Sequence, residues 1–249
     1  LLPPAIGKAE VICRENAILC GADWFDEVFS QLDTNIRVHW FKADGDQIQA
    51  NDILCELEGQ VDSLLTGERT ALNFLQTLSA TATQTSHYVN AVKHTACRIL
   101  DTRKTIPGMR LAQKYAVLCG GGVNHRIGLY DAILIKENHI AAAGSIRKAI
   151  SKAREDFPGI FVEVEVESRD EFEQAIDAEP DRILLDNFTV EELSSIVAFN
   201  CGCNQLEASG NITMENIAAV AETGVDFIST GSITKNIQAI DLSMRILSP

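Results

Sequence analysis

The sequence predicts an α/β protein whose second part is a parallel sheet covered by helices. Its 249 residues are 46% hydrophobic and 22% charged, a globular composition long enough for one large domain or two smaller ones. After residue 95, short apolar runs alternate with helical patterns in units of roughly 20 to 30 residues, which is typical of parallel strands joined by helices. Each apolar run also ends in polar residues. Together these observations favour a doubly wound sheet or an α/β barrel.

The chain before residue 95 has a different pattern. Its predicted elements are strands at 9–20 and 36–41 and helices at 22–32 and 66–94. We therefore predict two domains, 1–95 and 96–249, and expect the C-terminal tail to pack back on the first. Because residue 1 is leucine, we also expect the natural start of the chain to lie upstream.

Two short segments of the first domain resemble the hairpins of biotinyl and lipoyl carrier domains. Residues 43–48 and 53–59 are predicted strands joined by Gly-Asp turns. A carrier needs a lysine at the tip of its hairpin, and there is none between Asp44 and Gly59. The pattern therefore favours a small structural sheet.

The second domain carries a repeated order of strand, polar residue and helix. Its predicted strands are 98–101, 132–135, 161–166, 182–185, 205–208 and 226–229, with a weaker candidate at 123–125. Its predicted helices are 110–118, 145–156, 169–178, 190–199 and 214–223. Seven strands are one short of a closed eightfold barrel, so we predict a small, incomplete α/β barrel.

The charge of the chain excludes several classes of partner. The formal net charge of −14 repels polyphosphate and anionic lipid, which excludes duplex nucleic acid as a general partner. However, the window from Lys93 to His139 holds eight lysines and arginines against three acids, and three of the five histidines. A local basic region in an acidic chain is typical of proteins that bind small anions.

Seven cysteines, an odd number without a Cys-x-x-Cys pair or a zinc-ligand spacing, indicate reduced thiols in the cytoplasm. Cys201 and Cys203 flank one glycine, a spacing that by itself does not favour a redox role. No apolar run approaches the roughly 20 residues that a membrane-spanning helix needs, so we expect no membrane partner.

Polar residues follow each predicted strand of the second domain. They are Asp101 to Lys104, His125, Arg126, Lys136 to His139, Glu165, Asp186, Asn187, Ser209, Gly210, Gly231 and Ser232. In an α/β barrel the active site is built at the carboxyl ends of the strands, so these residues would share one cavity.

The cations of this set favour an anionic substrate. The guanidinium of an arginine matches carboxylate or phosphate oxygens in pairs, whereas a lysine is a compact point charge that tolerates several poses of a pyrophosphate. Two arginines and two lysines therefore suggest a substrate set with both carboxylates and phosphates. The alternatives are a salt bridge for each cation, and a structural core imidazole for His125.

Two acids at the same cavity, Glu165 and Asp186, would need partners, because a carboxylate inside a barrel loses hydration energy. They could bind sugar hydroxyls, hold Mg²⁺ or pair with the lysines. Glu163 and Glu167 lie at period two from Glu165, so the pattern does not decide which of the three faces the cavity. Near the end of the chain, two glycine turns could seat a phosphate: Ser209-Gly210-Asn211 and Thr230-Gly231-Ser232.

At these residues the sequence resembles the quinolinate phosphoribosyltransferases of NAD biosynthesis, over essentially its whole length. The runs that carry the resemblance are 66–74, 100–108, 114–122, 124–129, 134–139, 163–167, 185–188, 207–211 and 222–228. The resemblance implies an N-terminal α/β sandwich domain, an incomplete seven-stranded α/β barrel, and a homodimer whose sites form between the barrel of one subunit and the N-terminal domain of the other. Family chains start some tens of residues earlier, with a helical segment over the site.

The resemblance also implies roles for single residues. The carboxylates of quinolinate would be held by Arg69 of the neighbouring subunit, Arg103, His125, Arg126 and Lys136. The ribose hydroxyls of phosphoribosyl pyrophosphate would be bound by Glu165 and Asp186, and its phosphates by Lys104, Ser209, Gly210, Gly231 and Lys235. Mg²⁺ would bridge the diphosphate, with Glu165 and Asp186 as the nearest protein ligands.

We expect the catalytic residues to be Lys104, Lys136, Glu165 and Asp186, with Thr102, Asn211, Thr230 and Ser232 completing the substrate site. Asn211 stands where many relatives have glycine. Three other interpretations stay open at this point: transfer to nicotinate or another base, a non-catalytic anion or phosphate sensor, and an aldolase with Lys136 as its Schiff-base lysine.

Overall fold

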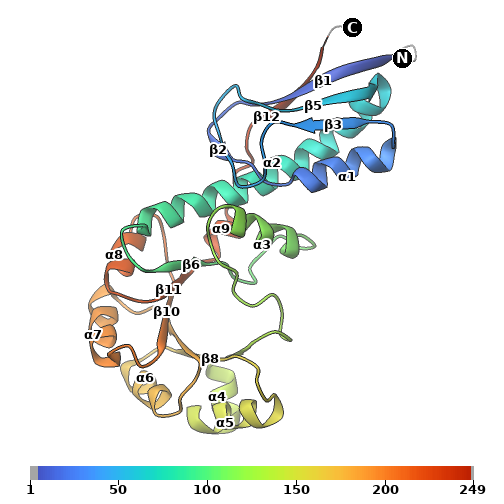
Figure 1. The fold of residues 1–249 in the computed structure, drawn as a ribbon. Coiled ribbons are helices and arrows are strands. Elements are labelled where there is room, and N and C mark those ends of the chain that lie inside the picture. Colours follow the sequence, from blue (N-terminus) through green and yellow to red (C-terminus); the bar gives the residue numbers. More distant parts are fainter. Residues whose placement is uncertain (1–4, 248–249) are drawn as a thin grey trace. The chain divides into compact units, whose positions relative to one another are not determined.

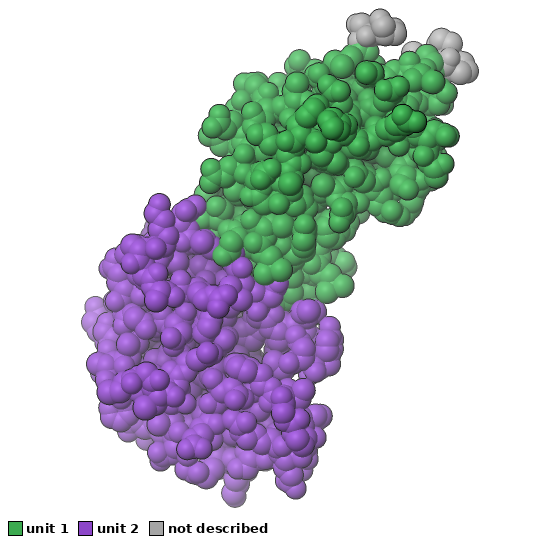
Figure 2. Space-filling model, in the orientation of Figure 1, with its two compact units in different colours: residues 1–87, 106–121, 236–249 green, residues 88–105, 122–235 purple. Residues whose placement is uncertain are grey.

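The computed structural model describes residues 5–247, which form two compact units (Figure 2). Unit 1 contains the chain up to His87, residues 106–121 and the segment from Asn236; unit 2 contains residues 88–105 and 122–235. This division differs from a single boundary at residue 95, because the chain returns to unit 1 twice after it first leaves. No helix of the described residues has both the length and the apolar character needed to cross a membrane.

Unit 1 is built on a four-stranded antiparallel sheet with the order β12-β1-β5-β3 (Figure 1). Its strands are β1 (Ile6–Cys13), β3 (Arg37–Trp40), β5 (Ile53–Gln60) and β12 (Leu242–Leu247). The last strand of the chain pairs with the first, Leu242 opposite Cys13 and Leu247 opposite Lys8. The C-terminal tail therefore belongs to the first sheet, as expected, although the sequence did not predict a strand there.

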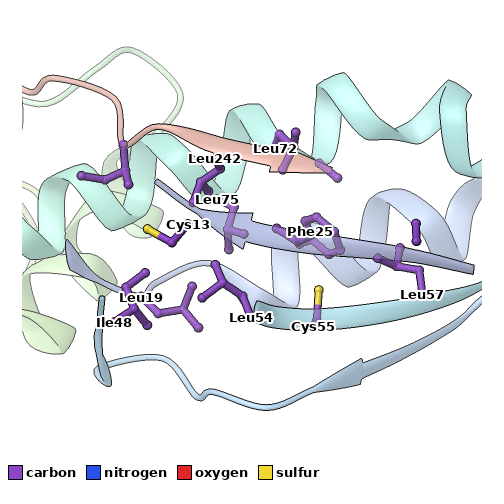
Figure 3. Packing of buried hydrophobic residues seen from close by; sticks show 14 of the residues in the cluster. Cys13, Leu19, Phe25, Ile48, Leu54, Cys55, Leu57, Leu72, Leu75 and Leu242 are labelled. Carbon is purple, nitrogen blue, oxygen red and sulfur yellow. The ribbon is translucent and has the colours of Figure 1, made fainter. Parts of the chain in front are cut away.

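Two helices pack their apolar sides on this sheet. They are α1 (Ala22–Leu32) and the long α2 (Val61–Val92). Phe25 from α1, Leu72 and Leu75 from α2, and Leu54 and Leu57 from β5 share one buried core, in which Figure 3 shows the side chains between strands and helices. Alternation of apolar residues on β5 places Leu57 on the face that the helices cover.

The predicted strand at 9–20 is interrupted, and the predicted hairpin does not form. After β1, the chain makes a separate strand, β2 (Ala17–Ile18), which pairs with β4 (Gln47–Ile48). Gly45 donates its N–H to Leu19, and Leu19 donates its own to Asp46. These bonds hold residues 45–48 beside β2. As a result, β4 and β5 lie in different sheets.

Unit 2 is a six-stranded parallel sheet with the order β6-β11-β10-β9-β8-β7. Its strands are β6 (Arg98–Leu100), β7 (Ile133–Ile135), β8 (Val162–Val166), β9 (Arg182–Asp186), β10 (Gln205–Ser209) and β11 (Phe227–Ser229). The pairing of the last strand with the first curls the sheet toward a barrel. The predicted strand at 123–125 is reduced to a single bridge between Val123 and Leu100, so the described chain leaves the barrel open between Val123 and β7.

Helices cover the outer side of this curved sheet (Figure 1). They are α4 (Glu137–Ala143), α5 (Ile146–Asp156), α6 (Arg169–Ile176), α7 (Val190–Asn200), α8 (Ile217–Glu222) and α9 (Ser232–Lys235). The starts of α5, α6 and α7 follow from their sequences, because Ser145, Ser168 and Thr189 each accept a hydrogen bond from the backbone of the first turn. The helix predicted at 110–118 is α3 (Arg110–Cys119), which belongs to unit 1. The short helices α4 and α9 were not predicted.

Candidate active site

A pocket opens at the carboxyl ends of the strands of unit 2, where the sequence predicts the site. Its lining residues are Thr102, Arg103, Lys104, His125, Arg126, Leu134, Lys136, Glu165, Leu184, Glu207, Ser209 and Ser229. Eight of these were predicted as site residues from the sequence. The lining residues as a whole come from all six strands of the sheet and from the segment after Val123, so the curvature of the sheet brings them together.

Arginine side chains give the pocket its anionic preference. Arg126 is partly buried, and its Nη1 donates to the backbone oxygen of Ala132 at 3.0 Å. Burial lowers the pKa of Arg126, and the charge of Arg103 lowers it further. Two guanidinium groups this close repel each other, and negative charge offsets the repulsion, whether it comes from protein acids such as Glu163 and Asp131 or from an anionic ligand. The arrangement therefore suits a ligand with at least two negative charges.

Lys136 and Glu165 form an ion pair at the same pocket. Lys136 follows β7 and is the N-terminal capping residue of α4, where its backbone N–H donates to His139 Nδ1 at 3.0 Å. Its Nζ contacts Glu165 Oε2 on the neighbouring strand β8. The lysine side chain is 40% exposed and the glutamate 11%, so both ends of the pair remain accessible from the pocket.

The structure separates the three glutamates that the sequence pattern leaves equivalent. Glu163 is buried in the interior of the sheet, Glu165 lines the pocket, and Glu167 lies exposed beyond the end of β8. Because side chains alternate along a strand, Glu163 and Glu165 point to the concave side and the three valines of β8 to the helices.

His125 is fixed at both ring nitrogens. Its Nδ1 accepts the backbone N–H of Arg126 at 2.7 Å, so the ring proton is assigned to Nε2, which donates to Glu163 Oε2 at 2.8 Å. The backbone N–H of His125 donates to Asp101 Oδ1 at 2.8 Å, and Asn124 donates to the other oxygen of the same carboxylate. The histidine thus lines the pocket while its nitrogens bond to the protein.

Glu207, which lines the pocket, and Glu163 form a buried acidic pair that sequence reasoning missed. Glu207 Oε2 accepts from Arg182 Nη1 at 2.9 Å and lies 3.7 Å from His125 Nε2. Burial, reinforced by the charge of Glu163, raises the pKa of Glu207 to about 7, and burial also raises the pKa of Glu163. Arg182 stacks on the ring of Phe227, 3.9 Å from its centroid. The sequence signal that could have indicated this pair is the position of Glu207, which faces the inside of the sheet on β10 near Arg182 of the neighbouring strand β9.

The predicted phosphate turns adjoin this pocket. Ser209 lines it, and a side chain at Gly231 would come within 3.0 Å of Lys104 Cδ, so this glycine leaves room for the lysine. At the other turn, Gly210 has φ +89° and Asn211 donates to Asn187 Oδ1 at 3.1 Å. Asp186, one residue earlier, accepts a hydrogen bond from Asn187 Nδ2 at 2.8 Å.

Other predicted site residues lie outside the pocket lining. They are Arg69, Asp186, Gly210, Asn211, Thr230, Gly231, Ser232 and Lys235. Thr230 and Ser232 form the turn into α9, where Ser232 donates its N–H to Thr230 Oγ1 at 3.2 Å. Lys235 is exposed at the end of α9. Arg69 lies on α2 in unit 1 with its side chain 68% exposed.

Carboxylate oxygens that could hold a hard cation are present at the pocket. Within the described chain, Glu137, Glu165 and Glu167 have carboxylate oxygens within 4.8 Å of one another. Oxygen donors of this kind fit Mg²⁺, which binds through one or two carboxylates and substrate phosphates. Asp186, predicted together with Glu165 as a metal ligand, is not part of this group.

Comparison with known proteins decides the family. The family model for the N-terminal domain of quinolinate phosphoribosyl transferase matches residues 2–79, and the model for its C-terminal domain matches residues 81–245. The chain belongs to the quinolinate phosphoribosyltransferase family. The family and the α/β fold predicted from the sequence are both confirmed, and the chain is accordingly a phosphoribosyl-transferring enzyme rather than a sensor.

Several relatives match the quinolinate phosphoribosyltransferase chain over most of their length. A probable nicotinate-nucleotide pyrophosphorylase (carboxylating) of Bacillus subtilis is 41% identical, covering 96% of this chain and 83% of the relative. A protein of the same description from Synechocystis is 40% identical, covering 97% and 83%. The structure of the nicotinate-nucleotide pyrophosphorylase from Francisella tularensis matches with a TM-score of 0.97 and 52% identity, covering 99% of this chain and 88% of that one.

Proposed function

We propose that this chain transfers the phosphoribosyl group of phosphoribosyl pyrophosphate to quinolinate, releasing pyrophosphate and CO₂ and forming nicotinate mononucleotide for NAD biosynthesis in the cytoplasm. The observation that carries the proposal is the pocket in which Arg103, Arg126 and Lys104 lie beside the Lys136–Glu165 pair. A dicarboxylate and a diphosphate together need this many cations, whereas the carboxylate of nicotinate needs fewer.

The proposed mechanism begins with departure of pyrophosphate from the anomeric carbon of the ribose. Lys104 neutralises the leaving group, and the carboxylate of Glu165 stabilises the positive charge that develops on the sugar. Asp186 binds the ribose hydroxyls. Glu165 and Asp186 would help to hold Mg²⁺, and the ion would further neutralise the charge of the leaving group.

The pyridine nitrogen of quinolinate then attacks the anomeric carbon. Arg103, Arg126 and Lys136 hold its two carboxylates, so that nitrogen and carbon lie at near-attack distance and no covalent enzyme intermediate is needed. After the nitrogen becomes quaternary, its positive charge stabilises the electron pair that stays on carbon 2 when the adjacent 2-carboxylate leaves as CO₂. The carbon at position 2 finally takes up a proton.

One assay tests the proposal. Purified protein with Mg²⁺ and phosphoribosyl pyrophosphate is supplied with quinolinate that carries labelled carbon in its 2-carboxylate, or with nicotinate. We expect labelled CO₂ and nicotinate mononucleotide from quinolinate, with nicotinate a poor substrate. Folded protein that releases no labelled CO₂ contradicts the proposal, and faster product formation from nicotinate favours the alternative base. An aldolase role is disfavoured, because Lys136 Nζ is engaged by the carboxylate of Glu165, whereas a Schiff-base lysine must be free to attack a carbonyl carbon.

We also propose that the enzyme acts as a homodimer in which Arg69 reaches the site of the neighbouring subunit. The exposed position of this side chain supports the proposal, since its nearest ion-pair partner is Glu68 at 3.9 Å on the same helix. Mixing inactive Arg69→Ala and Lys136→Ala variants tests it. Subunit exchange would then restore about a quarter of the wild-type activity, because half of the dimers carry one intact site. Verified exchange without recovery contradicts a shared site.

A further inference from the structure

Two cysteines outside the pocket lie together in unit 1. Cys20 lies between β2 and α1, and Cys119 is the last residue of α3. Their sulfur atoms and a carboxylate oxygen of Asp44 all lie within 4.8 Å of one another. Cys20 is fully buried, whereas Cys119 is partly exposed. The sequence gives no sign of this pair, because the two cysteines are separated by 98 residues.

The backbone around both sulfur atoms is firmly held. Ser79 Oγ accepts the N–H of Cys20 at 2.9 Å and donates to its carbonyl oxygen at 3.2 Å. At the other cysteine, a side chain on Gly120 would come within 2.7 Å of Thr85 Cβ, so the end of α3 packs tightly against α2. These contacts hold the backbone of both cysteines in the arrangement that places the two sulfur atoms close together.

Asp44 already has its hydrogen bonds. Its carboxylate accepts the N–H of Gly21 at 3.0 Å, the N–H of Ala22 at 3.2 Å and the hydroxyl of Tyr115 at 3.0 Å. Three donors occupy the oxygens that a metal ion would need. This leaves the two thiols as the reactive groups of the cluster and favours redox chemistry over metal binding.

We propose that Cys119 and Cys20 form a reversible disulfide when the protein meets a hydroperoxide, with Cys119 as the attacking thiol and Cys20 as the resolving one. Cys119 is the member that the oxidant can reach. The bond would tie the C-terminal end of α3 to the turn that precedes α1.

The electrostatics of the pair agree with these roles. The hydrogen bond from Cys20 lowers the pKa of the Cys119 thiol, although burial and the charge of Asp44 oppose it. The hydrogen bond to Cys119, together with burial, raises the pKa of Cys20. The partly exposed sulfur is therefore the better nucleophile, and the buried one keeps its proton until it reacts.

The chemistry balances in two steps. The Cys119 thiolate attacks one oxygen of hydrogen peroxide, the O–O bond breaks, and the products are a sulfenic acid and hydroxide. The sulfur of Cys20 then attacks the sulfur of Cys119, the S–O bond breaks, and the departing oxygen takes the Cys20 proton and leaves as water. The two sulfur atoms together lose two electrons, and the peroxide gains them.

The test maps the bond in the folded full-length protein after treatment with equimolar hydrogen peroxide. The exposed Cys201 and Cys203 are changed to serine in all samples, so that they consume no oxidant. Trypsin separates the pair into peptides 15–37 and 115–126, each with one cysteine. We expect these peptides to appear linked, and a thiol reductant to separate them. Linkage should also raise the Tm by roughly 5 to 15 °C.

Two variants distinguish the roles of the cysteines. In Cys20→Ala, the sulfenic acid at Cys119 should persist and be trapped by dimedone without any linked peptide. In Cys119→Ser, neither trapping at Cys20 nor linkage should occur. Oxidation of Cys119 to the sulfinic acid in the otherwise unchanged pair, without linked peptides, overturns the proposal. Dimedone labelling of Cys20 in Cys119→Ser overturns the assignment of the attacking thiol.

Discussion

His125 Nε2 donates to Glu163 Oε2 at 2.8 Å, and this contact connects a side chain of the pocket wall to a carboxylate buried in the barrel interior. Because the other ring nitrogen is bonded to the backbone of Arg126, the imidazole has one orientation. Glu163 therefore acts on the site through the histidine, as a positioning residue.

Replacement of Glu163 should affect activity according to whether an acceptor remains. Glu163→Gln keeps an oxygen for His125, so we expect kcat/KM within a few-fold of wild type. Glu163→Ala removes the acceptor at 2.8 Å from His125 Nε2, which costs about 1–3 kcal/mol and should lower kcat/KM at least 10-fold. Steady-state kinetics with quinolinate measure both, and Glu155→Ala, at an exposed position on α5, is the control. Equal losses in the Gln and Ala variants would argue against positioning.

Removal of Arg103 should weaken quinolinate binding much more than it lowers stability. Charge-assisted hydrogen bonds of a guanidinium contribute about 1.5–3 kcal/mol, so Arg103→Ala should raise the Kd for quinolinate roughly 10- to 150-fold. Calorimetry of binding and a thermal melt compare the two effects, with Arg103→Lys as the charge-preserving control. A parallel loss of affinity and Tm would instead indicate a structural salt bridge.

The Lys136–Glu165 pair should contribute little to stability, because the lysine side chain is 40% exposed and solvent screens the attraction. A double-mutant cycle of Lys136→Met and Glu165→Gln should give a coupling below about 1 kcal/mol in the free energy of unfolding. Each single variant should nevertheless lose most of its turnover. A coupling well above this value, with turnover preserved, would assign the pair to the fold.

The raised pKa of Glu207 makes stability depend on pH. Its carboxyl stays protonated in the folded protein up to about pH 7, whereas its ordinary pKa is 4.5. The folded state thus binds more protons in this window, and its free energy of unfolding should fall by up to about 3 kcal/mol as the pH rises from 4.5 to 7.

Urea denaturation at pH 5 and pH 7.5 isolates this effect. Glu207→Gln mimics the protonated acid, so the difference in stability between variant and wild type should shift in favour of the variant at pH 7.5. Titration of Glu207 by carboxyl carbon NMR should give a midpoint near pH 7. A difference that is the same at both pH values would show that Glu207 ionises normally in the folded protein.

Gly210 is constrained more tightly than its backbone angle alone requires. Its φ is +89°, and a Cβ there would lie 2.8 Å from the backbone nitrogen of Asn187 and closer still to that residue's Oδ1. Gly210→Ala should therefore destabilise the protein by about 2–4 kcal/mol. Gly159 is a matched control, because its φ is +80° and a Cβ would meet nothing within 4 Å. We expect denaturant melts to show a loss of about 1 kcal/mol for Gly159→Ala. Equal losses would mean that backbone strain alone accounts for Gly210.

Local sequence patterns determined most of the elements and most of the pocket. Helix α1 has the predicted bounds, and α5 and α7 lie within one residue of theirs, because apolar period and capping residues are local signals. Arg103, Arg126, Lys136 and Glu165 were found because each lies at or shortly after the carboxyl end of a predicted strand. Parallel topology then places all such residues at one edge.

Other features depend on contacts between distant parts of the chain, which one sequence does not display. The pairing of β12 with β1 and of Cys20 with Cys119 joins residues that no local pattern relates. The division of labour between Glu163 and Glu165 is also tertiary, since both point to the same side of β8. Their different depths in the barrel place Glu163 in contact with His125 and Glu165 at the pocket. The sequence by itself thus determined the family, the α/β repeat and the residue types of the site. The tertiary structure decided which carboxylates are buried away from solvent, because burial depends on neighbours contributed by strands far away in the chain.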